Sequence, residues 1–280
     1  MIILVLVGLG LCLGSFVNAL VWRLRQQLND EGQPRKLSAK KRHQLSIMRG
    51  RSMCPHCEHQ LSAKDLLPVV SWVYVRGRCR YCAKPISWQY PLVELLTALL
   101  FVLSYVFWPL SWDAQGMLEF VLWLPLLAGL IALCIYDIKW LLLPNRVVYT
   151  LFGFVGGWVG MRIFVFDGGL DAVYSALWGL MLGGGLFYAI FTVSSGKWIG
   201  GGDVKLGWLL GLLVGGPLPS MLLLFIASLL GTLTSVPLLV SGRMSRKAPM
   251  PFGPFLIGAA FIVQIFGASM IAWYKRQLGL

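Results

Sequence analysis

The chain has 280 residues, of which 58% are hydrophobic and only 12% are charged. Soluble domains carry about a quarter charged residues, so this composition excludes an ordinary soluble protein and predicts a multi-span membrane protein. The formal net charge of +13 suggests nucleic-acid binding, but 14 of the 24 Lys and Arg residues lie between Arg23 and Tyr90. A basic excess confined to one polar segment is what the positive-inside rule predicts for a cytoplasmic loop. We therefore expect membrane lipids, and no nucleic acid, to face this segment.

The first apolar run, Met1 to Trp22, is long enough to cross a bilayer at about 20 residues per crossing. It carries no charge before Arg23 and lacks the basic flank and cleavage site of a signal peptide, which predicts a retained span with its N-terminus outside. Gly14, Ser15 and Asn18 share one helical face. Small and polar residues on one face favour close helix contact and an interhelical hydrogen bond.

A polar module follows at residues 23–90 and contains a basic stretch, Pro34 to Arg51, which we expect to form a helix and loop near anionic headgroups. Its second half carries two Cys-x-x-Cys pairs separated by 21 residues: Cys54, Cys57, Cys79 and Cys82. This spacing is typical of a zinc site and argues against disulfides in a reducing compartment. We predict one structural zinc held by four thiolates, with His56 and His59 as bystanders.

The remaining apolar runs predict seven further crossings. The stretch from Val204 to Val240 has 37 residues broken by a Gly-Pro turn, and two full crossings need about 40, so we expect a hairpin with one short arm beginning at Asp203. The other predicted spans are Pro91–Trp108, Leu118–Tyr136, Val147–Phe166, Ala172–Val193 and Phe252–Tyr274. The fold class is therefore an all-α polytopic membrane protein of about eight helices, with the zinc module inserted between the first two.

Small residues at helical spacing within two of these spans predict faces for tight helix packing. They are Gly153, Gly156, Gly157 and Gly160 in one span, and Gly179 and Gly183 in the next.

Charge placement orients the eight-span model with both termini outside. Seven Lys and Arg residues join the polar module on the cytoplasmic side: Lys139, Arg146, Lys197, Lys205, Arg243, Arg246 and Lys247. Arg162, Lys275 and Arg276 lie at the other side, with the loop acids Asp113, Glu119, Asp167 and Asp171. This ratio predicts a multi-pass protein with its large loop and active site facing the cytoplasm.

Two acids stand at the cytoplasmic ends of neighbouring crossings, Asp137 and Asp203. An ionisable group near hydrocarbon is costly and indicates function. Two close carboxylates in a low dielectric share a proton, as in aspartic proteases, where one activates water and the other polarises the peptide carbonyl. Gly200 and Gly202 precede Asp203, and we expect them to allow close backbone approach or positive φ. For Glu94 we expect a capping role or a pair with a nearby Arg rather than a catalytic role.

Several motifs occur in an order that resembles the type IV prepilin peptidases. They are Gly14-Ser15-Phe16-x-Asn18 with Arg23, the four cysteines, Arg76-Gly77-Arg78-Cys79, Ile86-Ser87-x-x-Tyr90-Pro91-Leu92-Val93-Glu94, Asp137-Ile138-x-x-Leu141-Leu142-Leu143-Pro144-Asn145, Gly200-x-Gly202-Asp203-x-Lys205-Leu206, and Pro251-Phe252-Gly253-Pro254. Lys139 and Asn145 depart from the family, where an acid is common. The resemblance implies that Asp137 and Asp203 are catalytic, that the four cysteines bind zinc, and that Gly200 and Gly202 support the active-site loop.

The resemblance further implies a bacterial inner-membrane enzyme that removes the leader of type IV prepilins or pseudopilins and methylates the new N-terminus from S-adenosylmethionine. The implied organisation is a first span at residues 1–22, the zinc domain at 23–90 and a seven-helix peptidase domain at 91–280. Two alternatives remain open from the residues: a related Gly-x-Gly-Asp protease of the preflagellin or presenilin kind without methyltransferase activity, and a transporter or scaffold with structural acids.

Overall fold

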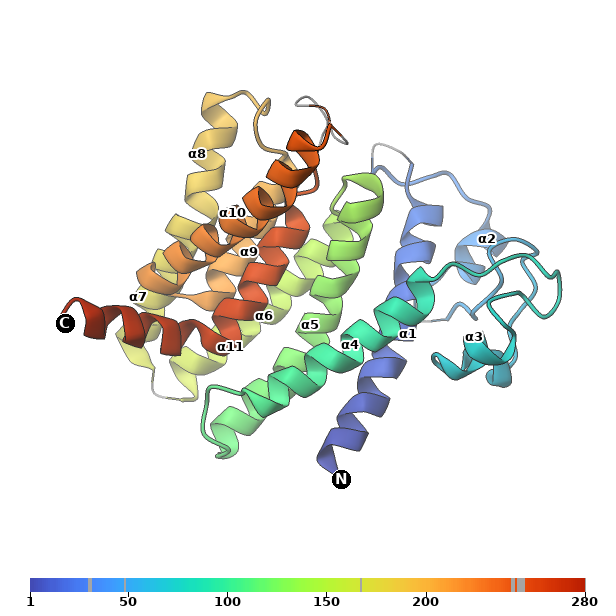
Figure 1. The fold of residues 1–280 in the computed structure, drawn as a ribbon, viewed down its shortest axis with the longest axis horizontal. Coiled ribbons are helices and arrows are strands. Elements are labelled where there is room, and N and C mark those ends of the chain that lie inside the picture. Colours follow the sequence, from blue (N-terminus) through green and yellow to red (C-terminus); the bar gives the residue numbers. More distant parts are fainter. Residues whose placement is uncertain (30–31, 48, 167, 243–244, 246–249, 280) are drawn as a thin grey trace. The chain divides into compact units, whose positions relative to one another are not determined.

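The computed structural model describes residues 1–29, 32–47, 49–166, 168–242, 245 and 250–279. In these ranges the chain forms helices and three isolated β-bridges (Figure 1). The helices are α1 (Ile2–Gln27), α2 (Ala39–Gln44), the 3₁₀-helix η1 (Ala63–Leu66), α3 (Val70–Tyr74), α4 (Gln89–Val106), α5 (Ala114–Trp140), α6 (Asn145–Phe164), α7 (Gly169–Gly179), the π-helical segment η2 (Leu180–Gly185), α8 (Leu186–Val193), α9 (Gly201–Val214), α10 (Pro217–Val240) and α11 (Gly253–Gln277).

Within the described ranges, seven helical segments are long and apolar enough to cross a membrane, and α7, η2 and α8 together form one of them. The predicted eighth crossing corresponds to α9, which has 14 residues. At 1.5 Å per residue α9 is about 21 Å long, shorter than the roughly 30 Å hydrocarbon core. The predicted all-α membrane fold is confirmed, including the short arm that begins beside Asp203. The predicted loop residues Asp167, Arg243, Arg246 and Lys247 lie outside the described residues.

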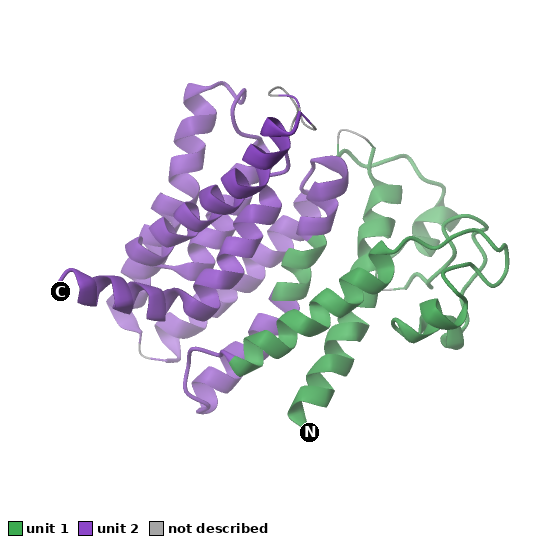
Figure 2. Cartoon of the chain, in the orientation of Figure 1, with its two compact units in different colours: residues 1–106, 127–132 green, residues 107–126, 133–280 purple. Residues whose placement is uncertain are grey.

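The chain divides into two compact units, residues 1–106 with 127–132 and residues 107–126 with 133–280 (Figure 2). In the first unit α1 packs closely along α4, because a Cβ on Gly10 would lie 2.5 Å from the Ala98 Cα and one on Gly14 would lie 2.7 Å from the Glu94 Cα. Asn18 Nδ2 donates to the Tyr90 carbonyl at 3.1 Å, and Asn18 Oδ1 accepts from Gln89 Nε2 at 3.2 Å. The predicted contact face of the first span is confirmed.

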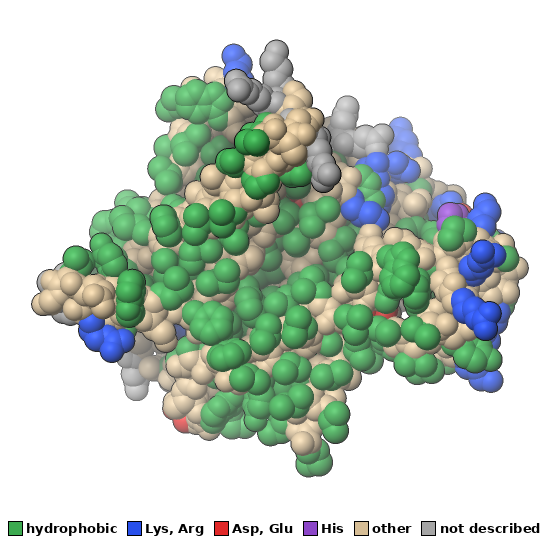
Figure 3. All heavy atoms as spheres, in the orientation of Figure 1, with side chains coloured by type: hydrophobic (Ala, Val, Ile, Leu, Met, Phe, Trp, Pro, Cys, Tyr) green, Lys and Arg blue, Asp and Glu red, His purple; other side chains and the backbone are tan. Residues whose placement is uncertain are grey.

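The polar module is tied to α1 by Arg23, which is 6% exposed. Its guanidinium donates to the carbonyls of Ser46 and Ile47 at 3.1 Å and of Gly50 at 2.9 Å. A buried guanidinium requires such acceptors, so this residue fixes the turn that precedes the cysteines. Lys and Arg side chains gather on this module, whereas hydrophobic side chains cover the helices (Figure 3).

In the second unit the short helix α9 lies against α7 and η2 through glycines on both sides. A Cβ on Gly183 would lie 2.5 Å from the Gly211 Cα, and one on Gly207 would lie 2.5 Å from the Gly183 carbonyl oxygen. Gly179 and Gly211 face each other in the same way. Backbones this close tolerate no side chain, so the predicted packing role of Gly179 and Gly183 is confirmed.

The glycines of α6 do not have the predicted role. A Cβ at Gly153, Gly156, Gly157 or Gly160 would meet nothing within 4 Å among the described residues. The buried face of α6 consists instead of large side chains: Val147, Val148, Leu151, Val155 and Trp158. Helical spacing identifies a stripe of small residues, but not which side of the helix meets a neighbour.

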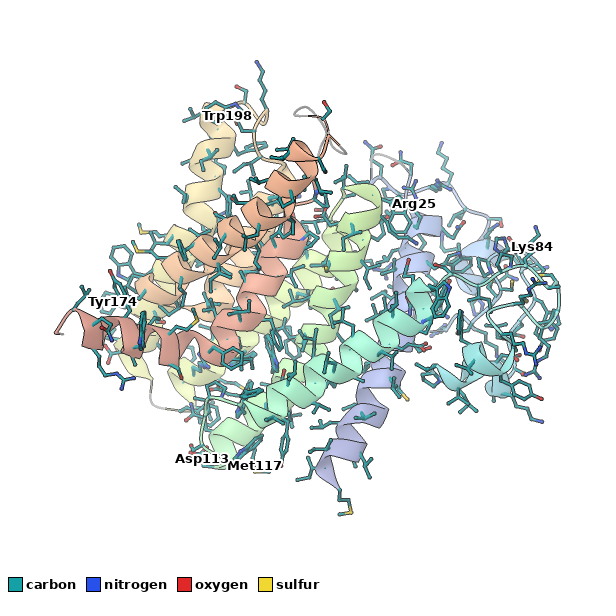
Figure 4. All side chains as sticks on the ribbon, viewed as in Figure 1. Arg25, Lys84, Asp113, Met117, Tyr174 and Trp198 are labelled. Atoms are coloured by element: carbon teal, nitrogen blue, oxygen red, sulfur yellow. The ribbon has the colours of Figure 1, made fainter. Side chains whose placement is uncertain are left out.

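Glu119 also differs from its predicted place in a loop. Helix α5 begins at Ala114, because Asp113, near the start of the helix in Figure 4, accepts the Gly116 N–H at 2.8 Å as an N-cap. Glu119 therefore lies inside the helix, is 1% exposed, and forms an ion pair with Arg162 of α6. A buried carboxylate needs such a partner, and the two residues tie α5 to α6.

Candidate active site and metal site

Asp137 lies in the last turn of α5 and is 5% exposed. Its Oδ2 accepts the backbone N–H of Gly253, the first residue of α11, at 3.1 Å. The first N–H groups of a helix have no partner within it. Here Pro254 has no N–H, and the N–H groups of Phe255 and Leu256 bond to the Phe252 carbonyl. The Asp137 carboxylate thus caps α11 from another helix.

Asp203 is the third residue of α9, and the N–H of Gly200, just before the helix begins, lies near its carboxylate. A carboxylate in the first turn is favoured there, because the first N–H groups of a helix have no partner within it. The Asp137 and Asp203 carboxylates lie close enough to interact electrostatically. The structure therefore brings together the two acids that the sequence singled out, one from α5 and one from α9.

The glycines before Asp203 do not have the positive φ angles that the sequence predicted. Gly200 has φ −73° and ψ 147°, and Gly201 and Gly202 are the first residues of α9, so positive φ is not the reason for glycine here. A Cβ on Gly202 would lie 3.2 Å from the Leu143 side chain, which is tight, whereas one on Gly200 would come no nearer than 3.6 Å to the Asp203 carboxylate. Close approach holds for Gly202 alone.

Two further contacts near this pair were not predicted. The Gly253 N–H bonds to Asp137, and a Cβ on Gly253 would lie 2.6 Å from Asp137 Oδ2. Lys205 Nζ donates to Asn145 Oδ1 at 2.8 Å and lies over the Tyr149 ring. Gly253 belongs to the Pro251–Pro254 motif, but a backbone donor leaves no side-chain signal in a sequence. Glu94 does pair as expected, although with the N–H of Val69 rather than with an Arg.

The four cysteines converge in the polar module. Their Sγ atoms lie within 4.8 Å of one another, and no His, Asp or Glu belongs to the group among the described residues. His59 instead stacks on Tyr81 with ring centroids 3.8 Å apart. Four thiol donors at this separation fit a closed tetrahedral Zn²⁺ site, so the donor set suits the predicted metal.

The two cysteine pairs sit in turns of the same construction. Cys54 N–H donates to the His59 carbonyl and Glu58 N–H to the Cys54 carbonyl; Cys79 N–H donates to Lys84 and Ala83 N–H to Cys79 in the same way. Glu58 and Ala83 have matching φ values of 55° and 57°. The bridges Met53–Gln60 and Arg78–Pro85 close the two turns. Each turn therefore presents two thiols in the same geometry.

Two known family models match the chain, one over its N-terminal part and one over its C-terminal part. Residues 8–108 match the bacterial peptidase A24 N-terminal domain, which includes the four cysteines, and residues 124–236 match the type IV leader peptidase family, which includes Asp137 and Asp203. The chain belongs to this family of membrane peptidases.

The curated relatives carry consistent names. A prepilin leader peptidase/N-methyltransferase of Aeromonas hydrophila is 34% identical over 279 residues, covering 95% of this chain and 91% of the relative. A protein of the same name from Bacillus subtilis is 30% identical, with 84% and 90% covered. A type 4 prepilin-like proteins leader peptide-processing enzyme of Escherichia coli is 35% identical, with 88% and 87% covered. No solved structure matches the chain.

These findings confirm the predicted resemblance and the prediction of a peptidase with methyltransferase activity. They do not favour the transporter or scaffold, nor the proteases without methyltransferase activity.

Proposed function

We propose that this enzyme removes the leader peptides of type IV prepilins or pseudopilins with Asp137 and Asp203 as the catalytic pair, and then N-methylates the new N-terminus. The observation that carries the catalytic assignment is the meeting of these two carboxylates, with Asp137 held by the first N–H of α11. Two interacting carboxylates at the ends of membrane helices are suited to share one proton.

In the proposed reaction the ionised carboxylate takes a proton from water while the water oxygen attacks the peptide carbonyl carbon. The protonated carboxyl gives its proton to the carbonyl oxygen, and collapse of the tetrahedral diol breaks the C–N bond as a proton passes to the leaving amine. The hydrogen bond from Gly253 holds Oδ2 of Asp137 and so orients the other oxygen for this proton transfer. Asp203 lies in the first turn of α9, where the unpaired N–H groups favour a carboxylate, and the absence of a side chain on Gly202 lets α9 approach Leu143.

The four cysteines would hold a Zn²⁺ ion in a structural role, since four thiolates complete its coordination and leave no position for water. S-adenosylmethionine would supply an electrophilic methyl group to the newly exposed amine. We assign no residue to this donor. The division into residues 1–22, 23–90 and 91–280 as anchor, zinc domain and peptidase domain is part of the same proposal.

The proposed location is the bacterial inner membrane, with the zinc module and the active site facing the cytoplasm. Support for this orientation comes from charge. The module carries most Lys and Arg of the chain, and Lys139, Arg146 and Lys205 lie near the ends of α5, α6 and α9 where the two acids meet. Limited proteolysis of sealed membrane vesicles would test this orientation. The module should be cleaved only when the protease can reach the cytoplasmic side of the membrane.

The catalytic assignment is tested with the purified chain and a peptide that spans a prepilin leader junction. Asp137→Asn and Asp203→Asn should each lower cleavage by about 10³-fold or more, because each acid has a role in proton transfer that the other cannot duplicate. Asp171→Asn, in the first turn of α7 and exposed, is the matched control and should cleave like the unmodified chain. Near-normal cleavage by either dyad variant would overturn the assignment.

A further inference from the structure

The zinc module exposes large apolar side chains on one short region. We call this region the α3 surface. It consists of Leu66 (41% exposed), Leu67 (54%), Val70 (64%), Val73 (61%), Tyr74 (79%) and Trp88 (66%). A contiguous exposed apolar patch indicates a binding surface rather than ordinary solvent contact.

Three contacts hold α3, one of them to α4 and two to the residues that lead into α4. Val69 N–H, at the start of α3, donates to Glu94 Oε2 at 2.7 Å. Trp72 Nε1 donates to the Ile86 carbonyl at 3.3 Å, and the rings of Trp72 and Trp88 lie 4.2 Å apart. Glu94 lies in the second turn of α4, about 7 Å along the helix from Gln89 at 1.5 Å per residue. The α3 surface is therefore fixed at the level where α4 begins its apolar run.

The backbone at Val69, where α3 begins, is strained. Such a conformation indicates that the surrounding structure holds α3 in this one position. Val69 has φ 59° and ψ −51°, and Val70 N–H bonds to the Pro68 carbonyl, which together form a γ-turn of the rare kind. A β-branched residue with positive φ persists only where its surroundings fix it. Glu94, 6% exposed, supplies the acceptor that the turned Val69 N–H requires.

The α3 surface lies beside the first turns of α4, a candidate membrane span whose Leu92, Leu95, Leu96 and Leu99 are 46–59% exposed. Tyr74 and Trp88 are the residue types that concentrate at membrane interfaces. Exposed basic residues border the patch, and Arg80 lies over the Tyr74 ring with its Cζ 5.8 Å from the centroid. A second copy or a substrate helix would bury the apolar residues equally well. Three features favour the lipid interface instead. The α3 surface lies at the height where α4 begins, it contains Tyr and Trp, and basic residues border it.

We propose that the α3 surface inserts into the interfacial layer of the bilayer and anchors the zinc module in the membrane plane. The apolar residues would enter the boundary between headgroups and acyl chains, while Lys64, Arg76 and Arg80 would face anionic headgroups. This inference does not depend on which residues catalyse the reaction.

The test uses the full chain in nanodiscs of mixed phosphatidylcholine and phosphatidylglycerol. Tyr74→p-benzoylphenylalanine places a photocrosslinker on the α3 surface. Lys84→p-benzoylphenylalanine is the control, because Lys84 is exposed at the outer edge of the same module (Figure 4). After illumination, intact-mass spectrometry should detect about tenfold more lipid adduct at position 74 than at position 84, since only an interfacial position meets acyl chains.

Val73→p-benzoylphenylalanine repeats the measurement if the first variant does not assemble, and leader-peptide cleavage verifies the fold of each variant. Glu94→Gln in the Tyr74 background should lower the lipid adduct several-fold, because it weakens the acceptor for Val69. Equal adduct at positions 74 and 84 would overturn the proposal. So would a crosslinked dimer, or an adduct to added prepilin in place of lipid, because each identifies a different occupant.

Discussion

Residues 28–88 and helix α9 have very different interiors. Among the described residues in 28–88, the buried hydrophobic side chains are Leu45 and two of the four clustered cysteines, Cys54 and Cys79. Helix α9 alone buries Val204, Leu206, Leu209, Leu210 and Leu213 within 14 residues. Packing of apolar side chains therefore contributes little to the module, which directed hydrogen bonds and the proposed metal at the four cysteines would stabilise. The second unit combines the buried apolar side chains of α9 with close backbone contact at glycines.

Metal removal should have the largest effect and should act on the module alone. Structural zinc contributes about 10 kcal/mol of binding free energy to small domains that do not fold without it. Chelation, or Cys82→Ser, should abolish amide-exchange protection in residues 50–87 and leave α9 protected. Metal analysis of the untreated protein should find one Zn²⁺ per chain. Loss of protection in α9 at the same chelator concentration would contradict the independence of the two regions.

Gly253→Ala should lower cleavage by about 100-fold, since its Cβ would lie 2.6 Å from Asp137 Oδ2 and move a reacting group. Gly258→Ala is the matched control on the same helix, where a Cβ would meet only Leu230 at 3.8 Å. We expect KM to change little in Gly253→Ala while kcat falls, because the contact positions the acid and not the peptide. Equal activity of the two variants would show that Gly253 does not position Asp137.

Gly211→Ala should destabilise the second unit by roughly 2 kcal/mol, because a methyl group has no room against the Gly179 and Gly183 backbones. Gly156→Ala, on the open side of α6, should be neutral or stabilising by up to about 1 kcal/mol, because alanine is the better helix former. Thermal unfolding in detergent, followed by circular dichroism, compares the pair. A similar change in both variants would show that helix propensity outweighs packing here.

The smallest effects are expected at the glycines before Asp203. Gly202→Ala should reduce cleavage by no more than about tenfold, since the Leu143 side chain can yield by a few tenths of an ångström. Gly200→Ala and Gly201→Ala should remain close to normal, because their Cβ atoms would meet nothing nearer than 3.6 Å and 3.8 Å. The rate of leader-peptide cleavage at saturating substrate compares these three variants. A severe defect in Gly200→Ala would indicate that substrate, rather than the fold, needs that space.

Sites built from reactive side chains at a regular spacing were predictable from the sequence. The cluster of four cysteines was predicted because two Cys-x-x-Cys turns supply four thiols in one geometry. The acids Asp137 and Asp203 were predicted to interact because each is isolated at the end of an apolar run. Asn18 was found as an interhelical donor because few polar residues lie within the first span.

Contacts that involve the backbone or the far side of a helix were not predictable. The donor to Asp137 is a main-chain N–H, visible in sequence only as a glycine followed by proline. The partner of Glu94 is the N–H of a strained valine, which no propensity favours. The α6 glycines had the right spacing for packing, yet large residues on the opposite side of that helix are the buried ones.

The two matching cysteine turns also act as the two ends of a crosslink. The proposed metal, shared between them, would close the chain from Cys57 to Cys79 into a loop of 21 intervening residues, and α3 lies within that loop. Closing a loop of this size restricts the unfolded chain by about 3 kcal/mol, as a disulfide would. The loop is pinned a second time where Val69 meets Glu94. Loss of either the proposed metal or the contact between Val69 and Glu94 would therefore release the segment that carries the α3 surface.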